Sequence, residues 1–209
     1  MRLSSSQKAS LLQAAKTYYA EVGQVKGYLA ARGLDDEAVE RHRLGYVADP
    51  LPGHESMAGR LAIPFLTPAG VADIRFRCVA DHVCKEVGCP KYMGLPGRPT
   101  PMYNVLALHS NSPKIGVTEG ELDAVAATRY VIPSVGIPGA EAWKPHYARC
   151  LADFDVIVFC DGDKAGRQLG RTIVREIPSA TIVNLPDGDD VNSTIQRDGP
   201  DGLRRKAGV

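Results

Sequence analysis

Apolar residues recur at helical spacing through the first part of the chain. The spacing predicts a helix over residues 11–22, a second over residues 25–29 and a third over residues 35–42. Gly33 and Gly45 follow the second and third patterns and are typical of helix ends. The chain is therefore expected to begin with helices.

Next come two β-rich segments. Residues 60–66 and 71–79 favour strands, and the Thr-Pro-Ala-Gly sequence of residues 67–70 between them predicts a hairpin. Residues 49–59 before the hairpin and residues 80–101 after it contain many Pro and Gly residues. Both are expected to be loops, and the second carries basic groups.

In the second half, short apolar runs alternate with helical patterns. Such alternation predicts parallel βαβ units. The runs are almost continuously apolar, as expected where helices cover both faces of a sheet. The predicted strands are residues 115–118, 131–135, 156–160 and 180–185, and the predicted helices are residues 121–130, 142–151 and 165–176.

The change of pattern falls at the His-Ser-Asn-Ser-Pro sequence of residues 109–113, a candidate linker. We expect an α/β protein in two parts. Residues 1–112 would form a smaller helical and β-rich lobe, and residues 113–209 a parallel sheet flanked by helices. With 209 residues, 44% hydrophobic and 23% charged, the chain can bury a sizeable core and is not a disordered or fibrous protein.

Composition also limits the environment and the partners. The longest apolar runs are far shorter than the ~18 residues that a membrane helix needs, so no membrane association is expected. Five cysteines, an odd number, argue against a disulfide scaffold and favour the reducing cytoplasm. Residues 1–112 carry 13 Lys and Arg against 10 Asp and Glu, whereas residues 113–209 carry 12 against 14. Charge alone therefore does not identify a nucleic-acid-binding protein.

Four potential metal ligands lie close together in the basic loop. They are Cys78, His82, Cys84 and Cys89. Zinc takes four Cys or His ligands in tetrahedral geometry, so this group is a candidate zinc site. The usual Cys-x-x-Cys pair is missing, and a loop of reduced thiols is the alternative.

Acidic residues follow three of the predicted strands. Glu119 comes directly after the first strand, Asp161 and Asp163 after the third, and Asp190 lies in the acidic run after the fourth. Parallel strands deliver such residues to one rim of the sheet, and Asp123 would lie near it. Gathered carboxylates repel one another unless a cation compensates, and Mg²⁺ prefers such oxygen ligands. A single Asp-Gly-Asp is usually a turn, but three clusters together predict a divalent-metal site.

These segments resemble the Toprim domain that primases, topoisomerases and some nucleases share. The Glu-Gly-Glu-Leu-Asp sequence of residues 119–123 and the Asp-Gly-Asp-Lys-Ala-Gly sequence of residues 161–166 resemble the versions found in DnaG-type DNA primases of bacteria and phages. The acidic run of residues 185–190 agrees with them. In the first half, residues 28–34 and 60–65, Arg77 and the Pro-Lys-Tyr sequence of residues 90–92 are similar to the primase RNA-polymerase domain.

The resemblance implies a primase N-terminal lobe followed by a Toprim catalytic domain. Such a DNA primase makes short RNA primers on single-stranded DNA during replication, using NTPs and Mg²⁺ or Mn²⁺. Glu119, Asp161 and Asp163 would be catalytic metal-site acids, supported by Asp123 and Asp190. The residues implied for nucleic-acid or NTP binding are Arg60, Arg75, Arg77, Lys91 and Tyr92.

No cysteine precedes Cys78, so we expect a compact, phage-like form without the family's N-terminal zinc ribbon. A replicative helicase or a separate zinc-ribbon subunit is then an expected partner, and a phage-encoded protein would act in the host cytoplasm. Asn192 stands where the family usually has a further Asp, and a lysine expected before the Toprim part is missing. A non-catalytic single-stranded-DNA-binding subunit and a Toprim-type nuclease therefore stay open as alternatives, with a topoisomerase fragment a more distant one.

Overall fold

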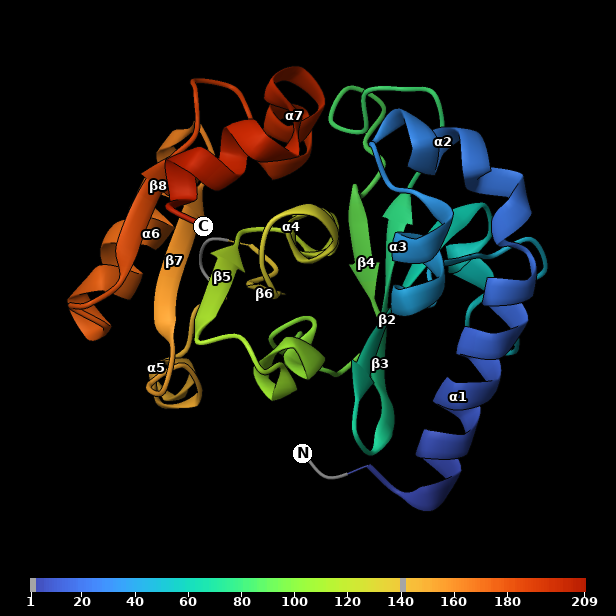
Figure 1. The fold of residues 1–209 in the computed structure, drawn as a ribbon. Coiled ribbons are helices and arrows are strands. Elements are labelled where there is room, and N and C mark those ends of the chain that lie inside the picture. The colour runs from blue at the N-terminus through green and yellow to red at the C-terminus, as the bar shows by residue number, and fades with distance from the viewer. Residues whose placement is uncertain (1–2, 140–141) are drawn as a thin grey trace. The chain divides into compact units, whose positions relative to one another are not determined.

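The computed structural model describes residues 3–139 and 142–209. The chain separates into two compact units, residues 1–100 and residues 101–209 (Figure 1). The division falls before the linker candidate at residues 109–113. Tyr103 already belongs to the second unit, because its backbone N–H donates to the carbonyl of Gly136 at 2.8 Å and its carbonyl accepts from the N–H of Gly136 at 3.2 Å.

The first unit is built on an antiparallel sheet of order β1-β2-β3-β4. The predicted hairpin is confirmed: β2 and β3 pair from Arg60 opposite Cys78 to Thr67 opposite Gly70, with a shift of register between Phe65 and Leu66. The two outer strands are short and were not predicted. The strands are β1 (Gly45–Tyr46), β2 (Arg60–Thr67), β3 (Gly70–Cys78) and β4 (Tyr92–Gly94).

Helices precede this sheet, as the apolar spacing predicted. The longest, α1 (Ser5–Ala20), begins with a capping box between Ser4 and Gln7. Its buried face, including Leu11 and Tyr18, joins the core formed by the hairpin strands. The shorter elements are η1 (Val22–Val25), α2 (Lys26–Ala31), α3 (Asp36–His42) and η2 (Glu55–Met57).

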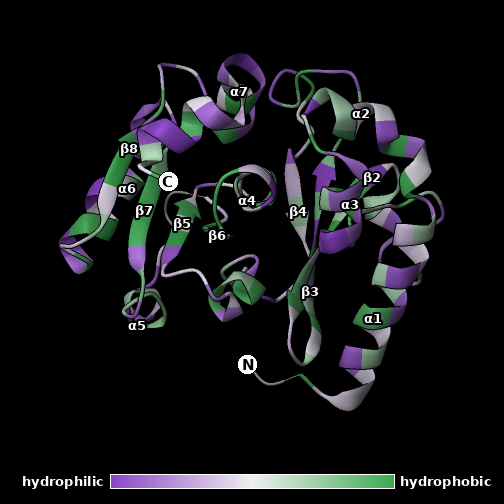
Figure 2. Ribbon diagram, in the orientation of Figure 1, coloured by the Kyte–Doolittle hydropathy of each residue, from purple (hydrophilic) through white to green (hydrophobic). Residues whose placement is uncertain are grey.

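The second unit contains a four-stranded parallel sheet of order β6-β5-β7-β8. Val156, Val158 and Cys160 join a core that includes residues of α5 and α6. The alternate residues Ile157 and Phe159 are also buried, so both faces of β7 are covered. Figure 2 shows β5 and β7 largely in the hydrophobic colour. The strands are β5 (Lys114–Thr118), β6 (Ser134–Gly136), β7 (Asp155–Cys160) and β8 (Thr181–Asn184).

Helices follow the strands in the predicted order, with three corrections. The helix expected over residues 142–151 is only α5 (His146–Cys150), which begins after Pro145; proline disfavours helical backbone in the residue before it. The strand expected over residues 131–135 begins after Pro133, which has no N–H to donate. A C-terminal helix was not predicted at all. The helices are η3 (Val105–His109), α4 (Glu121–Tyr130), α5, α6 (Lys164–Glu176) and α7 (Val191–Ala207).

The missed helix, α7, has a kink that explains the failure. Gly199 inside it has φ 71° and ψ 166°, and Pro200 follows. Gly and Pro at these positions are ordinary signals of a helix end, and here they join two helical segments. Among the described residues, no helix is both long and apolar enough to cross a membrane.

The buried His42 predicts a pH dependence of stability. Burial, and to a smaller extent the charge of Arg41, lowers the pKa of His42 to about 4. The unfolded chain, with a pKa near the ordinary value of about 6.5, then binds the proton more readily than the folded one. The contribution of His42 to stability is therefore full above pH ~6.5 and is lost as the pH falls towards ~4, by up to about 3 kcal/mol.

Urea unfolding of the full chain at a series of pH values tests this effect. His42→Leu is expected to flatten the dependence between pH ~6.5 and ~4, whereas substitution of the exposed His109 leaves it unchanged. An equally steep loss of stability in the His42→Leu protein would contradict the prediction.

Candidate metal-binding and nucleic-acid-binding sites

The loops that follow β7 and β8 are joined through their backbones. The N–H of Leu185 donates to the carbonyl of Cys160 at 3.0 Å, which extends the pairing of the two strands. Beyond it, the N–H of Gly162 donates to the carbonyl of Asp189 at 2.8 Å, and the N–H of Gly188 donates to the carbonyl of Gly162 at 3.0 Å. The acids of the two loops are thus held at one edge of the sheet, as the topology predicted.

Glycine is required at two positions where the loops after β7 and β8 meet. A Cβ at Gly162 would lie 1.7 Å from the carbonyl oxygen of Pro186. A Cβ at Gly166 would lie 2.6 Å from the backbone nitrogen of Asp161. The glycines of the Asp-Gly-Asp-Lys-Ala-Gly sequence therefore allow two backbones to approach, so the motif has a packing requirement in addition to any chemistry.

Asp161 is the electrostatic centre of the second unit. Burial raises the pKa of this carboxyl to about 8, and neighbouring negative charges add to the shift. In decreasing order of effect these charges belong to Asp123, Glu119, Asp190 and Asp163. The five acids that the sequence selected as candidate metal ligands thus lie near enough to one another for the charges of four of them to act on Asp161.

One carboxylate oxygen of this cluster needs a hydrogen-bond donor or a cation. The Oδ1 atom of Asp161 is buried and accepts no hydrogen bond from the described residues. A buried carboxylate oxygen without a donor is costly. A hard divalent cation held by several carboxylates would satisfy it and remove the repulsion, so the residues present fit Mg²⁺ or Mn²⁺.

Two of the acids also cap helices. Asp163 precedes α6, and its side chain accepts from the N–H of Gly166 at 2.8 Å. Asp190 precedes α7 and accepts from the N–H of Ser193 at 2.7 Å. Each carboxylate is therefore fixed in position by a helix N-terminus, whose dipole also stabilises its charge.

Asn192 is a site residue whose role the sequence did not reveal. Its side-chain Nδ2 donates to Oδ1 of Asp123 at 2.8 Å, and its backbone N–H donates to the same oxygen at 3.2 Å. Asn192 is only 3% exposed. At a position where the resemblance implies a further Asp, Asn192 positions a carboxylate supplied by α4. Only the fold, which packs α7 against α4, indicates this role.

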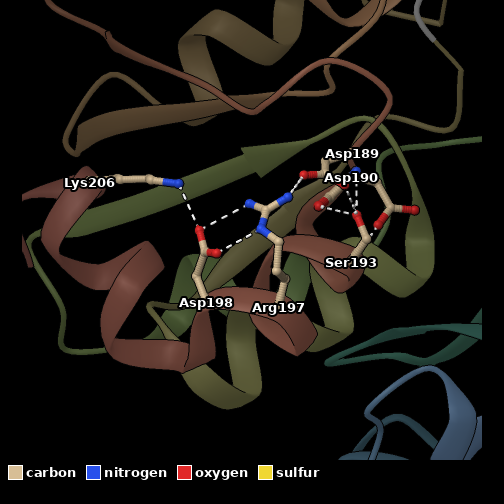
Figure 3. A network of polar contacts seen from close by, with 6 residues as sticks. All are labelled: Asp189, Asp190, Ser193, Arg197, Asp198 and Lys206. Carbon is tan, nitrogen blue, oxygen red and sulfur yellow. Dashed lines mark hydrogen bonds and ion pairs between the residues drawn. The ribbon is translucent and has the colours of Figure 1, made fainter.

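A second unforeseen residue, Arg197, balances the acidic loop. Its guanidinium forms an ion pair with Asp189 (Figure 3). It forms a second ion pair with Asp198, in which the nitrogen and oxygen atoms are 2.7 Å apart. Lys206, beyond the kink, binds the same Asp198 at 2.9 Å. Hydrogen bonds from Arg197 and then Lys206 hold the pKa of Asp198 well below its ordinary value. The two segments of α7 and the loop before them are thereby linked through one network.

In the first unit, two arginines flank one tyrosine. Arg75 and Arg77 are two residues apart on β3 and share a face of the strand, and Tyr92 on β4 is the register partner of Arg77. The Arg75 and Arg77 guanidinium carbons lie 4.7 Å and 5.0 Å from the centroid of the Tyr92 ring. Arg77 also donates to the hydroxyls of Tyr28, at 2.6 Å, and of Tyr92. Three of the predicted nucleic-acid-binding residues therefore form one cluster.

Next to this cluster lies a basic cavity of about 500 Å³. Lys91, predicted to bind phosphates, lines it, and the sequence analysis did not select Arg32 or Lys85 for this role. No carboxylate is among the described residues that line the cavity, so it is suited to an anion. Its basic residues are Arg32, Arg77, Lys85 and Lys91.

Arg60 occupies a different environment from the other predicted basic residues. It is 8% exposed, and its guanidinium donates to the carbonyl of Pro90 at 2.7 Å and to Sγ of Cys89 at 3.4 Å. These contacts support the loop between β3 and β4. The same loop groups the predicted Cys and His ligands, with one ligand atom from each within 4.8 Å of the others; these are Cys78, His82, Cys84 and Cys89.

Comparison with known proteins agrees with the fold and the acid cluster. Residues 116–195 match the Toprim-like family. The Gene 57 protein of Mycobacterium phage D29 is 38% identical over 151 residues, covering 69% of this chain and 95% of the relative. The DNA primase of Geobacillus stearothermophilus is 24% identical over 222 residues, covering 87% of this chain and 36% of the relative. This chain thus spans about a third of the cellular primase.

A solved structure extends the likeness to almost the whole chain. The RNA polymerase domain of Mycobacterium tuberculosis primase DnaG, in complex with double-stranded DNA, superposes with a TM-score of 0.78 at 20% identity, covering 98% of this chain and 81% of that one. The parallel sheet, its acidic rim and the family match define a Toprim-domain protein. Within that class, the chain belongs to the same family as the Gene 57 protein of phage D29, and it is similar in sequence and fold to DnaG-type primases.

The close contact at Gly162 predicts a large cost for one methyl group. Gly162→Ala would push Cβ into the Pro186 carbonyl, 1.7 Å away, and separate the loops that carry the acids. We expect the free energy of unfolding to fall by about 3 kcal/mol, measured by urea unfolding. Gly27→Ala is the control, because no atom lies within 4 Å of its added Cβ; equal stability of the two variants would contradict the prediction.

Proposed function

We propose that this chain is a DNA primase that joins NTPs into short RNA primers on a single-stranded DNA template. The observation that carries the proposal is the cluster of five carboxylates around the buried, donor-less Oδ1 of Asp161. Similarity to DnaG-type primases supports nucleotidyl transfer as its use. Single-stranded DNA and NTPs are then the ligands, while a helicase and a separate zinc-ribbon subunit stay predictions.

Glu119, Asp161 and Asp163 would hold the divalent ion, Mg²⁺ or Mn²⁺. When bound, such an ion neutralises triphosphate charge in displacement at phosphorus. The chain itself contributes by holding these carboxylates in position. The caps at Asp163 and Asp190 and the hydrogen bonds from Asn192 to Asp123 fix the carboxylates before substrate arrives. Catalysis would then come mainly from alignment and charge compensation.

The first unit would supply contacts to phosphates and bases. Arg75, Arg77 and Lys91 carry positive charge, and the cavity that Arg77 and Lys91 line has room for phosphate groups. Tyr92 lies beside two guanidinium groups, so a base stacked on its ring would also meet positive charge. Arg60 would act indirectly, by holding the loop through Pro90 and Cys89.

Substitution of the acids tests the catalytic assignment. In a primer-synthesis assay with labelled NTPs, single-stranded DNA and Mg²⁺ or Mn²⁺, we expect Asp161→Asn and Glu119→Gln each to lower the rate at least about 100-fold. Binding of single-stranded DNA should change less than about twofold, because these acids do not form the basic surface. Asp187→Asn is the matched control, since its side chain lies in the same acidic rim but is 88% exposed.

The native chain also separates the alternatives. Shortening of the DNA instead of growth of RNA would favour the Toprim-type nuclease. Binding of single-stranded DNA without product would favour the non-catalytic subunit. Either result would overturn the primase assignment for the chain acting alone.

Salt dependence tests the basic surface. Lys91→Ala removes one cation from the cavity, so single-stranded-DNA affinity should fall similarly for different sequences, and the slope of log K against log salt should decrease by about 0.7. Fluorescence anisotropy at several salt concentrations measures both. Lys8→Ala, which removes an exposed cation of α1, should leave the slope unchanged; the same decrease in both variants would contradict a local contact.

A further inference from the structure

The loop between β3 and β4 has no apolar core of its own. Its ends are closed by the N–H of Cys78, which donates to the carbonyl of Lys91 at 2.9 Å. Two of its three valines, Val83 and Val87, are 58% and 60% exposed. Apolar burial therefore contributes little to holding this loop in one conformation, and a cross-link between its side chains would add to the few hydrogen bonds that do so.

Four potential ligands converge at the interior of the loop. The three thiol sulfurs and a ring nitrogen of His82 lie within 4.8 Å of one another. The Cys78 Sγ and His82 Nε2 atoms are 3.5 Å apart. Tetrahedral zinc, with its ordinary bond lengths, requires about 3.6 Å between sulfur and nitrogen and about 3.8 Å between two sulfurs.

We propose that Cys78, His82, Cys84 and Cys89 bind one structural zinc ion. Three thiolates and one imidazole complete a tetrahedral shell, which leaves no position for substrate and indicates a structural, not a catalytic, site. The cysteines in this loop are free thiols, so no disulfide competes for them. The spacing, with five and four residues between successive cysteines, hides the site from searches for Cys-x-x-Cys pairs.

The surroundings match the charge of such a site. Zinc with three thiolates and one neutral imidazole carries a net charge of about −1. Arg60 provides the opposite charge, because its Nη2 donates to Sγ of Cys89 at 3.4 Å. Its Nη1 donates to the carbonyl of Pro90 at 2.7 Å, so the same side chain fixes the loop next to the ligand. Hydrogen bonds of this kind orient metal ligands and tune their basicity.

The ion would also shape the basic cavity. Cys78, His82, Cys84 and Cys89 all line it, and the loop supplies Lys85 to its wall. Holding the loop in one conformation would therefore keep Lys85 near Lys91. The zinc site goes beyond the proposed function, since binding of zinc does not require that the chain synthesise primers.

Metal content is the first measurement. The full chain, purified under reducing conditions from cells supplied with zinc, is analysed by inductively coupled plasma mass spectrometry. We expect about one zinc per chain, retained in Cys150→Ser and lost in Cys84→Ser and Cys89→Ser. Cys150 is the matched control because it is an exposed free thiol on α5. Cobalt added to the metal-free protein should give the visible absorption of tetrahedral thiolate coordination.

Limited trypsin digestion provides a second readout. Removal of zinc by a chelator should speed cleavage after Lys85 at least about tenfold, while circular dichroism of the chain is unchanged. Absence of zinc from the native chain, equal zinc in Cys84→Ser, or a disulfide between two of these cysteines under reducing conditions would overturn the proposal. Asp161→Asn should keep its zinc, so failure of primer synthesis and failure of the zinc site are distinguishable.

Discussion

Repulsion between carboxylates is the constraint on which the second unit depends. Burial and four neighbouring acids raise the pKa of Asp161 to about 8, so this carboxyl resists ionisation at neutral pH, where an isolated carboxyl is charged. The fold opposes this repulsion with several independent restraints. Strand pairing, helix caps and the Asn192 amide each fix one part of the cluster. A divalent cation bound by these carboxylates would offset the repulsion with attraction.

The first unit, in contrast, carries positively charged side chains on a small antiparallel sheet. Alternation along β3 places Arg75 and Arg77 on one face, and the short β4 provides Tyr92 opposite Arg77 and within reach of both guanidinium groups. The opposite face of β3 contributes Ile74 and Phe76 to the core. One strand therefore stabilises the unit and carries its candidate binding groups, which leaves the loop beyond it without apolar support.

Most residues of the candidate site could be predicted from the sequence, because the residues next to each of them in the chain indicate its position. An apolar strand followed at once by Glu119 or Asp161 indicates a position at the rim, and parallel pairing then brings such residues together. The hairpin of β2 and β3 was equally local. Roles that depend on distant partners could not be predicted: Asn192 gains its function from Asp123, 69 residues earlier, and Arg197 from the loop at Asp189. The sequence of α7 was misleading, since Gly199 and Pro200 mark an end and the chain continues through it.

The backbone bonds between the loops after β7 and β8 have a consequence for variation among related chains. The bonds between Gly162, Gly188 and Asp189 use only main-chain atoms, and the side chain of Asp187 beside them is 88% exposed. Substitutions at such exposed positions can therefore accumulate without altering the rim, whereas Gly162 tolerates none that adds a Cβ. Relatives with little sequence identity in these loops can keep the same arrangement of acids. An alignment that compares residue types alone will therefore underestimate how closely their structures are related.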